Sequence, residues 1–363
     1  MGSLVFVGFG LAGSLSLSLE GVVVAKSADK VYLEVYTSPS DDSLRRELEG
    51  IIGSEVELIG REIIEDGRRI LEESKSLNVV LIAPGDSMVA TTHMDLRIRA
   101  AAEGVETWVV HNASILSALF GETGLHAYKF GKTVTMARSG PTLHTTVYST
   151  VFENLVHRLH TIILLEHDYA SGFFFDPLSA IKGLLDTEAE LNQGIFDEDT
   201  LLIFASRIGR KDQSVVAGRI STLLQKDFGQ PPHVLVVPGR LHFTEVDALK
   251  VLLKTDETEI RDNSERVPRL AEKMVNRYTK KARAALDRAR ALCSKDEEQI
   301  YAQLFENVEC YVSDAERFLG QGRDELAVLS TGYAEGLLDA LTYLSDKFLN
   351  IWEQPAGNER INE

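Results

Sequence analysis

A ten-residue stretch, 84–93, holds the residue types that most clearly suggest chemistry in this chain. It reads Pro-Gly-Asp-Ser-Met-Val-Ala-Thr-Thr-His and follows 78–83, an apolar run typical of a buried parallel strand. Proline and glycine end such a strand sharply, and open α/β sheets bind ligands at the carboxyl ends of their strands. Asp86 is therefore a candidate acceptor for a ligand hydroxyl or amine. Thr91 and Thr92 are compact donors beside it. The alternative is that Asp86 caps the helix predicted over 94–103 and that Thr91, Thr92 and His93 close the turn. His93 is expected at the start of that helix and not in proton transfer.

Two other turns have the same position relative to a predicted strand. Gly8-Phe9-Gly10-Leu11-Ala12-Gly13 follows a strand at 4–7, and its glycines allow the backbone to approach a cofactor closely. Ser114 follows a strand at 106–110 and begins the next predicted helix. Ser114 is either an ordinary N-cap or a hydroxyl that faces a ligand at the helix N-terminus.

Several motifs of this chain occur in the same order in one known family. They are 34–38 (Glu-Val-Tyr-Thr-Ser), 84–100 (Pro-Gly-Asp-x-x-Val-Ala-Thr-Thr-His-x-x-Leu-Arg-x-Arg-Ala), 124–131 (Gly-Leu-x-x-Tyr-x-Phe-Gly), 159–165 and 228–242 with its Pro-Pro-His turn. Residues 1–245 thereby resemble the diphthine synthases, members of the tetrapyrrole methylase superfamily of S-adenosylmethionine (SAM) methyltransferases.

The resemblance implies an activity, a cofactor and partners. The reaction would be methyl transfer from SAM to the amino group of the modified histidine of translation elongation factor 2, in diphthamide biosynthesis. The protein would be a cytoplasmic, archaeal homodimer, with SAM between two α/β domains. Two alternatives stay open at this point: a methyltransferase of the same fold with another acceptor, and a translation-factor docking protein that uses its C-terminal region.

The resemblance also implies a cofactor site, carried over residue by residue. Asp86 would engage a polar end of SAM, Leu165 and Ile208 would pack on the adenosine, and His233 would contact the adenine. The full implied set is Leu11, Asp86, Val89, Ser114, Ile115, Leu165, Ile208 and His233. No catalytic residue is assigned, and no metal site is expected, since 197–199 (Asp-Glu-Asp) is interpreted as a solvated loop.

The chain departs from the family pattern at three places. Ser87 stands where the family usually has proline. The segment 138–146 contains Pro141 but lacks the expected Trp and the family's Trp-Pro pattern, and it reads Leu-His-Thr-Thr at 143–146. Residues 166–168 read Glu-His-Asp in place of Asp-Ile-Lys. Ser87 costs its loop some rigidity and no functional group. The other two changes motivate the hypothesis of a different acceptor.

The elements that must position these residues follow from the pattern. Short apolar strands alternate with helices, which predicts a parallel sheet with right-handed crossovers. The predicted strands are 4–7, 30–36, 56–58, 78–83, 106–110, 133–137, 159–165 and 201–206, and the predicted helices include 18–26, 44–52, 63–76, 94–103 and 177–193. The expected fold is two α/β domains, 1–112 and 113–254, with the cofactor cleft between them.

Beyond about residue 254 the composition changes to long helical stretches. Helices predicted over 268–292, 296–319 and 323–352 form an antiparallel three-helix bundle at 262–353, which resembles a small archaeal domain without an assigned role. The expected core stripe of its last helix is Leu326, Leu329, Tyr333, Leu337, Leu341, Leu344 and Phe348. Its first helix is basic over 269–290. A solvated face is the expected interpretation, and nucleic-acid or partner contact is the alternative.

The net charge, the cysteine content and the apolar stretch near the N-terminus argue against several classes of function. The chain has 363 residues and a net charge of −17, which argues against general affinity for nucleic acid or anionic membranes. Two cysteines, Cys293 and Cys310, form no metal-ligand pattern and are expected to be buried thiols in a reducing compartment. The apolar stretch 4–19 is interrupted by glycines and has no preceding basic residue, so neither a signal peptide nor a membrane span is expected.

Overall fold

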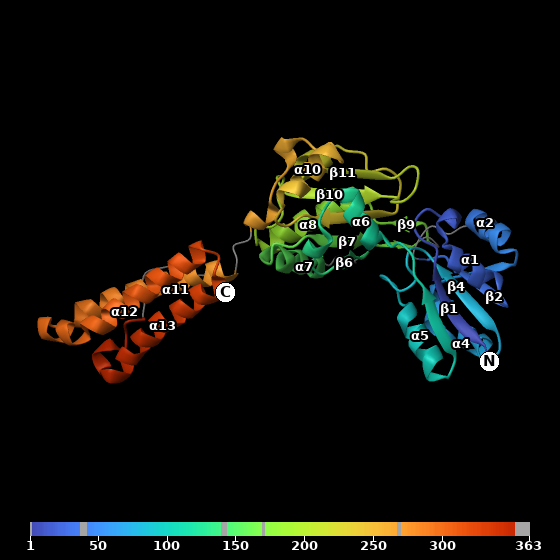
Figure 1. Ribbon diagram of the computed structural model, residues 1–363. Helices are drawn as coiled ribbons and strands as arrows, with labels where there is room; N and C mark the ends of the chain where they lie inside the picture. Colours follow the sequence, from blue (N-terminus) through green and yellow to red (C-terminus); the bar gives the residue numbers. More distant parts are fainter. Residues whose placement is uncertain (1, 37–41, 139–143, 169–170, 267–269, 353–363) are drawn as a thin grey trace. The chain divides into compact units, whose positions relative to one another are not determined.

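The computed structural model describes residues 2–36, 42–138, 144–168, 171–266 and 270–352 (Figure 1). The chain divides into two compact units, Met1–Val267 and Pro268–Glu363. The first unit contains two five-stranded sheets and the second is helical. The predicted domain limits at 112 and 254 stay a prediction. Among the described residues, no helix is long and apolar enough to cross a membrane.

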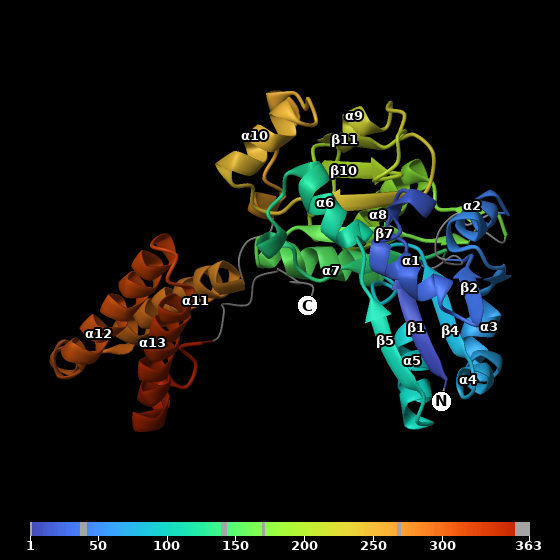
Figure 2. The ribbon, with the colours of Figure 1, turned by 45° about the vertical axis from the view of Figure 1, so that its right-hand side comes forward.

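The first sheet is entirely parallel, with the order β3-β2-β4-β1-β5 (Figure 2). Its elements are β1 (Ser3–Gly8), α1 (Leu19–Lys26), β2 (Lys30–Glu34), α2 (Asp42–Ile52), β3 (Val56–Ile59), α3 (Arg61–Asp66), α4 (Arg68–Ser74), β4 (Asn78–Ala83), α5 (His93–Ala102) and β5 (Glu106–Val110). The expected parallel α/β sheet is confirmed.

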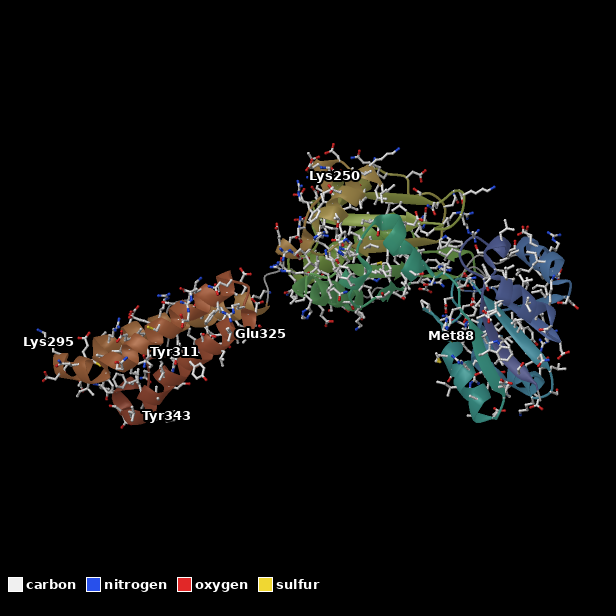
Figure 3. The ribbon with its side chains drawn as sticks, in the orientation of Figure 1. Met88, Lys250, Lys295, Tyr311, Glu325 and Tyr343 are labelled. Atoms are coloured by element: carbon white, nitrogen blue, oxygen red, sulfur yellow. The ribbon has the colours of Figure 1, made fainter. Side chains whose placement is uncertain are left out.

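Both faces of this sheet are covered by helices. Leu4 and Phe6 of β1 pack with α3, α4 and α5, and Met88, labelled in Figure 3, joins that cluster. Val5 and Val7 pack on the other face with α1 and α2. The alternation follows from the two-residue period of a strand, and it makes every central strand apolar on both sides.

The helix predicted over 63–76 is wrong, because the structure breaks it into α3 and α4 at Gly67. Gly67 has a φ of 67°, a left-handed conformation that ends one helix and begins the next. A Cβ on Gly67 would lie 2.6 Å from the guanidinium of Arg99, so that side chain would have to shift if Gly67 were replaced. The second predicted strand is too long as well, since β2 ends at Glu34.

The second sheet is mixed, with the order β11-β10-β12-β7-β6. Only β6 and β7 pair in parallel, whereas β7, β12, β10 and β11 are antiparallel. Its elements are α6 (Ile115–Thr123), β6 (Val134–Met136), α7 (Thr145–Val156), β7 (Thr161–Leu165), α8 (Pro177–Leu191), β10 (Leu201–Ser206), β11 (Ser214–Arg219), α9 (Ile220–Leu223), β12 (His233–Val237) and α10 (Phe243–Val251).

Helices also cover both faces of the second sheet. α7 and α8 pack on one face and α6 and α10 on the other. A small hairpin of β8 (His167–Asp168) and β9 (Phe173–Phe174) follows β7. Residues 139–143 of the divergent segment lie outside the described residues, while Thr145 and Thr146 begin α7 and do not form the expected loop.

The second unit contains α11 (Leu270–Leu292), α12 (Lys295–Gly320) and α13 (Asp324–Leu344), packed as the expected bundle. Two details differ from the prediction. α13 ends at Leu344, followed by a short 3-10 turn, Asp346–Phe348. Leu329, Tyr333 and Leu344 are exposed, because α13 turns its small residues, such as Ala327 and Ala334, to the other helices. Close packing of helices favours small side chains at the contact.

The two cysteines also differ from the prediction of two buried thiols. Cys310 is exposed on α12, and Cys293 is half-buried after α11, where its Sγ lies 3.3 Å from the carbonyl oxygen of Ala289. Both are free thiols.

Candidate functional site

The candidate site begins where the connections of the first sheet diverge. The chain leaves β1 through α1 toward β2, and it leaves β4 through α5 toward β5 on the opposite side. These crossovers cover opposite faces of the sheet. Because β1 and β4 are neighbours, their carboxyl ends form the topological switch point at which open α/β sheets bind ligands.

Backbone atoms join the two loops at this point. Gly10 and Gly85 exchange two hydrogen bonds, with N···O distances of 3.0 and 2.9 Å. Gly10 has a φ of 76° and Gly85 a φ of 65°, in the left-handed region that favours glycine. A Cβ on Gly8 would lie 2.5 Å from the Gly85 carbonyl oxygen. The glycine-rich loop and the Pro-Gly-Asp turn therefore form one continuous floor.

Asp86 stands on this floor and is nearly buried, with 7% of its surface exposed. Its Oδ1 accepts the N–H of Met88 at 2.9 Å, and its Oδ2 accepts His111 Nδ1–H at 2.8 Å and the N–H of Asn112 at 3.2 Å. Burial alone would raise the pKa of this carboxyl, but these three donors outweigh burial and lower it. Asp86 is thus an ionised group that ties the β4 turn to the end of β5. It does not cap α5.

The segment after β5 holds the next wall of the site. Asn112 donates from Nδ2 to the carbonyl oxygens of Gly8 and Ser16, both at 2.9 Å. Ser114 is the N-cap of α6, where its Oγ accepts the N–H of Ser117. Ser114 therefore has the capping role, and it also lines the cavity described next. The two interpretations of this serine are compatible.

The second sheet closes the cavity with mostly apolar side chains. Leu165 ends β7, Ile208 follows β10, and His233 begins β12, three strands whose ends lie next to one another. Gly209 packs so closely on Leu11 that a Cβ there would lie 2.8 Å from the Leu11 Cβ. This close contact joins the turn after β10 to the glycine-rich loop.

All eight residues implied from the sequence line this one cavity. Six further lining residues that carry polar groups are absent from the implied cofactor site, although the sequence offered Thr91 as a possible donor at the turn after β4. They are Glu34, Thr91, His93, His167, Arg207 and Arg210. Of these, only His167 lay in a segment that departs from the family pattern. His167 shows that the replaced segment after β7 does reach the site.

His93 is held within the fold, in accordance with its expected place at the helix start. It is the first residue of α5 and is fully buried. Its Nδ1 donates to the carbonyl oxygen of Ser87 at 2.9 Å, because a carbonyl can only accept. Its Nε2 lies 3.4 Å from Oε2 of Glu34, which is also fully buried. The pair links β2 to the turn that follows β4.

His233 has one ring nitrogen engaged and one without a partner among the described residues. Its Nε2 donates to the carbonyl oxygen of Gly229 at 3.1 Å, and its Nδ1 is buried without a hydrogen bond within the part of the chain that the structure describes. Burial lowers the pKa of this histidine. A neutral ring with hydrogen on Nε2 leaves Nδ1 as an acceptor for a ligand N–H.

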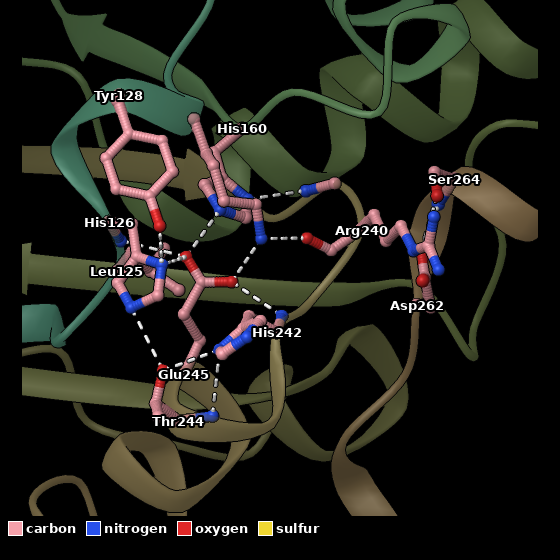
Figure 4. A network of polar contacts seen from close by, with 12 residues as sticks. Leu125, His126, Tyr128, His160, Arg240, His242, Thr244, Glu245, Asp262 and Ser264 are labelled. Carbon is pink, nitrogen blue, oxygen red and sulfur yellow. Dashed lines mark hydrogen bonds and ion pairs between the residues drawn. The ribbon is translucent and has the colours of Figure 1, made fainter.

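A second polar cluster, which we call the Glu245 network, lies at the start of α10 (Figure 4). The Glu245 carboxylate is fully buried. It accepts the backbone N–H groups of His126 and His242 at 2.8 and 2.7 Å. It also accepts the side-chain Nε2–H of His160 at 3.0 Å and the ammonium of Lys129. Burial alone would raise its pKa, but these donors hold the pKa far below the usual range.

His160 shows how completely this network is satisfied. Its Nδ1 accepts the N–H of Gly239 at 2.8 Å while its Nε2 donates to Glu245, so both ring nitrogens have partners. Burial lowers the pKa of His160. The Glu245 network joins the loop after α6, the start of β7 and the start of α10. It has the arrangement of a structural crosslink.

Metal-ligating side chains do not gather anywhere in the described ranges. No three His, Cys, Asp or Glu side chains there are grouped so that they could hold a metal ion.

Comparison with known families gives one match over most of the first unit. The family model of Tetrapyrrole (Corrin/Porphyrin) Methylases matches residues 3–224, which includes both sheets up to β11 and most of the cavity lining. The chain belongs to the tetrapyrrole methylase family. A second model, a protein family of unknown function called DUF357, matches residues 277–345 in the bundle.

Relatives narrow the type of methylase. The diphthine synthase of Methanosarcina mazei is 38% identical over 268 residues, which are 72% of this chain and 100% of that protein. The diphthine synthase of Methanocaldococcus jannaschii is 36% identical over 253 residues, 69% of this chain and 98% of its own. These relatives place this methylase among SAM-dependent methyltransferases of the diphthine synthase type, as the sequence motifs implied.

Solved structures agree with this placement. A crystal structure of diphthine synthase matches with a TM-score of 0.63 and 33% identity over 71% of this chain and 99% of that one. A putative diphthine synthase from Entamoeba histolytica matches with a TM-score of 0.63 and 32% identity, over 70% and 99% of the two chains. Each of these four proteins is aligned over 98–100% of its own length, whereas the aligned part is at most 72% of this chain.

Proposed function

We propose that this methylase transfers methyl groups from SAM to the amino group of an aminocarboxypropyl-modified histidine in translation elongation factor 2, a step of diphthamide biosynthesis. One observation carries the proposal: eight residues carried over from the diphthine synthase motifs, dispersed between positions 11 and 233, line a single cavity. The relatives named diphthine synthase support the choice of acceptor.

The lining residues fit SAM in three chemical respects. Gly10 and Gly85 line the cavity with left-handed backbone and no side chain, so a ligand can approach the main chain there. Leu165 and Ile208 offer apolar surface for the adenosine. Nδ1 of His233, which has no hydrogen-bond partner among the described residues, can accept an adenine N–H. Ionised Asp86 gives one negative charge for the cationic end of the cofactor.

The bound cofactor supplies an activated methyl group on a sulfonium, so the protein mainly has to align the acceptor nitrogen, the methyl carbon and the sulfur. Val89 holds the cofactor from the predicted first domain. Ser114 and Ile115, together with Leu165 and Ile208, hold it from the predicted second domain. We assign no general base. Asp86 and His93 already serve as hydrogen-bonding partners within the fold, and a desolvated cavity favours the neutral form of an amine.

We further propose that the protein acts in the cytoplasm as a homodimer. Both statements rest on its membership of the diphthine synthase group. Size-exclusion chromatography with light scattering measures the oligomeric state directly. A monomer at working enzyme concentrations would contradict it.

The experiment that tests the function is an intact-mass assay with elongation factor 2 that carries the aminocarboxypropyl histidine. A gain of one or more methyl masses with SAM, absent for Asp86→Ala, is the expected result, and the mass also counts the methyl groups. If calorimetry shows that SAM binds but elongation factor 2 gains no mass, the assignment of the cofactor stands and the assignment of the acceptor is wrong. That outcome would favour the alternative acceptor suggested by the divergent segments 138–146 and 166–168.

A further inference from the structure

A second cavity adjoins the cofactor cavity, and two arginines line both. Arg207 and Arg210 belong to the turn that follows β10, and they are the residues common to the two linings. The second cavity is polar and lies between the first and second sheets. Its other polar side chains are Ser43, Glu47 and Gln230.

Arg207 is held firmly at this boundary. Its backbone has a φ of 50°, a left-handed conformation that is strained for arginine, and its N–H donates to the carbonyl oxygen of Pro232 at 3.2 Å. Its Nε pairs with Asp212 at 2.8 Å, and one terminal nitrogen lies 3.5 Å from the carbonyl oxygen of Pro231. The surrounding turn therefore fixes both the backbone and the guanidinium.

Arg210 completes the turn. Its N–H donates to the carbonyl oxygen of Arg207 at 3.0 Å, so the two arginines leave the same tight turn three residues apart. Lys211, the next residue, is exposed and belongs to neither cavity lining. Two guanidiniums at one boundary stand out in a chain with a net charge of −17, because such a chain repels anions in general.

We propose that Arg207 and Arg210 bind the carboxylate of the acceptor's aminocarboxypropyl group and so deliver its amine to the cofactor cavity. This inference rests on the proposed function. The amine and the carboxylate of that group are attached to the same carbon, so a carboxylate fixed between the cavities holds the amine at their boundary. Guanidinium groups match carboxylates through paired, charge-assisted hydrogen bonds.

The second cavity suits the acceptor in another respect. Glu47 contributes a carboxylate whose Oε2 accepts the Ser14 hydroxyl at 2.7 Å, so the lining contains both signs of charge. An amino-acid group with an ammonium and a carboxylate carries both signs as well. The arginines are positioning residues in this assignment, since methyl transfer itself takes place at the nitrogen.

The test compares Arg207→Gln, Arg210→Gln and the control Lys211→Gln in the complete chain. We expect each arginine variant to raise the KM for modified elongation factor 2 by roughly tenfold or more, while the control stays near wild type. Arg210→Lys should recover part of the loss, since a lysine keeps the charge and loses the paired geometry. The Kd for SAM, measured by calorimetry, should stay unchanged in all variants.

A competition experiment isolates the carboxylate itself. Two synthetic peptides are used as inhibitors, one with an aminocarboxypropyl histidine and one with an aminopropyl histidine. The wild type should bind the first peptide about tenfold more tightly, and the Arg210→Gln variant should bind both equally.

Two results would overturn the inference while the proposed function stands. One is an equal rise in the SAM Kd, which would assign the arginines to the cofactor's own carboxylate. The other is an unchanged KM with an unchanged preference between the peptides. A wild type that does not methylate elongation factor 2 at all would overturn the proposed function, and this inference with it.

Discussion

The cofactor cavity and the Glu245 network use the same kinds of residues for opposite purposes. Each contains a nearly buried carboxylate and buried histidines that join separate elements. In the Glu245 network both ring nitrogens of His160 have partners within the protein. In the cavity, His233 keeps a buried Nδ1 without a hydrogen-bond partner in the described part of the chain. A completely satisfied cluster stabilises the fold, whereas an incomplete one is prepared for a ligand.

The largest effect should come from the Glu245 network. Glu245→Ala leaves His160 and Lys129 without their buried acceptor, so we expect the free energy of unfolding to fall by about 3–5 kcal/mol. Urea unfolding followed by circular dichroism measures the change. Asp247→Ala on the same helix is the control, because Asp247 is exposed. If the free energy of unfolding fell by less than about 1 kcal/mol, the Glu245 network would contribute little to holding these elements together.

The same carboxylate predicts a pH dependence with a definite sign. The pKa of Glu245 is lowered in the folded protein, so its contribution to stability is present above the pKa of an unfolded glutamate, about 4.3, and is lost as the pH falls below it. The difference in unfolding free energy between wild type and Glu245→Gln should therefore be constant near neutral pH and shrink below about pH 4. A difference that grows in acid would contradict this assignment.

Substitution of Asp86 should act on ligand binding more than on the fold. Asp86→Ala removes one negative charge from the cavity and three internal hydrogen bonds from its floor, so we expect the SAM Kd to rise about 10-fold to 100-fold. Calorimetry measures the Kd. Asp95→Ala on the neighbouring helix is the control, because that carboxylate is exposed. If Asp86→Ala lowered the free energy of unfolding as much as Glu245→Ala does, Asp86 would be a structural group like Glu245, and the contrast between the cavity and the Glu245 network would fail.

A smaller effect is expected at His233. His233→Phe keeps a ring but removes the Nδ1 acceptor together with the Nε2–H that bonds the carbonyl oxygen of Gly229, so the SAM Kd should rise about threefold to tenfold with little change in kcat. His157→Asn, at an exposed position, serves as the control. An unchanged Kd would mean that the free nitrogen does not meet the cofactor.

The smallest effect should follow from removal of the second unit. Residues 1–267 form a compact unit, and the diphthine synthase of Methanosarcina mazei is matched over its whole length by 72% of this chain. We expect that a chain of residues 1–267 methylates elongation factor 2 with a kcat/KM within about twofold of the complete chain. A higher KM with unchanged kcat would instead support the alternative in which the bundle docks onto the translation factor.

Strong local signals made much of the first unit predictable. The strands β4, β5 and β10 begin and end at the predicted residues, because apolar runs there are bounded by turn residues. α7 was missed, since Thr145, Thr146, Val147 and Val151 are β-branched and lower its helix propensity. The order of the second sheet could not be derived either, because strands that are apolar on both faces do not reveal their direction.

The candidate site was predictable to a different degree. Its eight expected residues came from motif resemblance, and periodicity alone would have identified only turns and caps. Arg207 and Arg210 were not predicted as site residues, because a single sequence does not show that one turn borders two cavities. The exposed Leu329 and Tyr333 show the same limit in the bundle, where small residues on the opposite side of α13 form the contact.

The glycine floor has a consequence for mutational scanning of this enzyme. Gly8, Gly10 and Gly85 contribute main-chain atoms only, and an alanine scan reports what is lost when a side chain is removed. At these positions alanine adds an atom, within 2.5 Å of a carbonyl oxygen in the case of Gly8. A scan would therefore record a steric defect at Gly8 and Gly10 and a backbone-conformation defect at Gly85, and any contact of the peptide groups with a ligand would not be detected. Replacing individual amide bonds by esters would measure it directly.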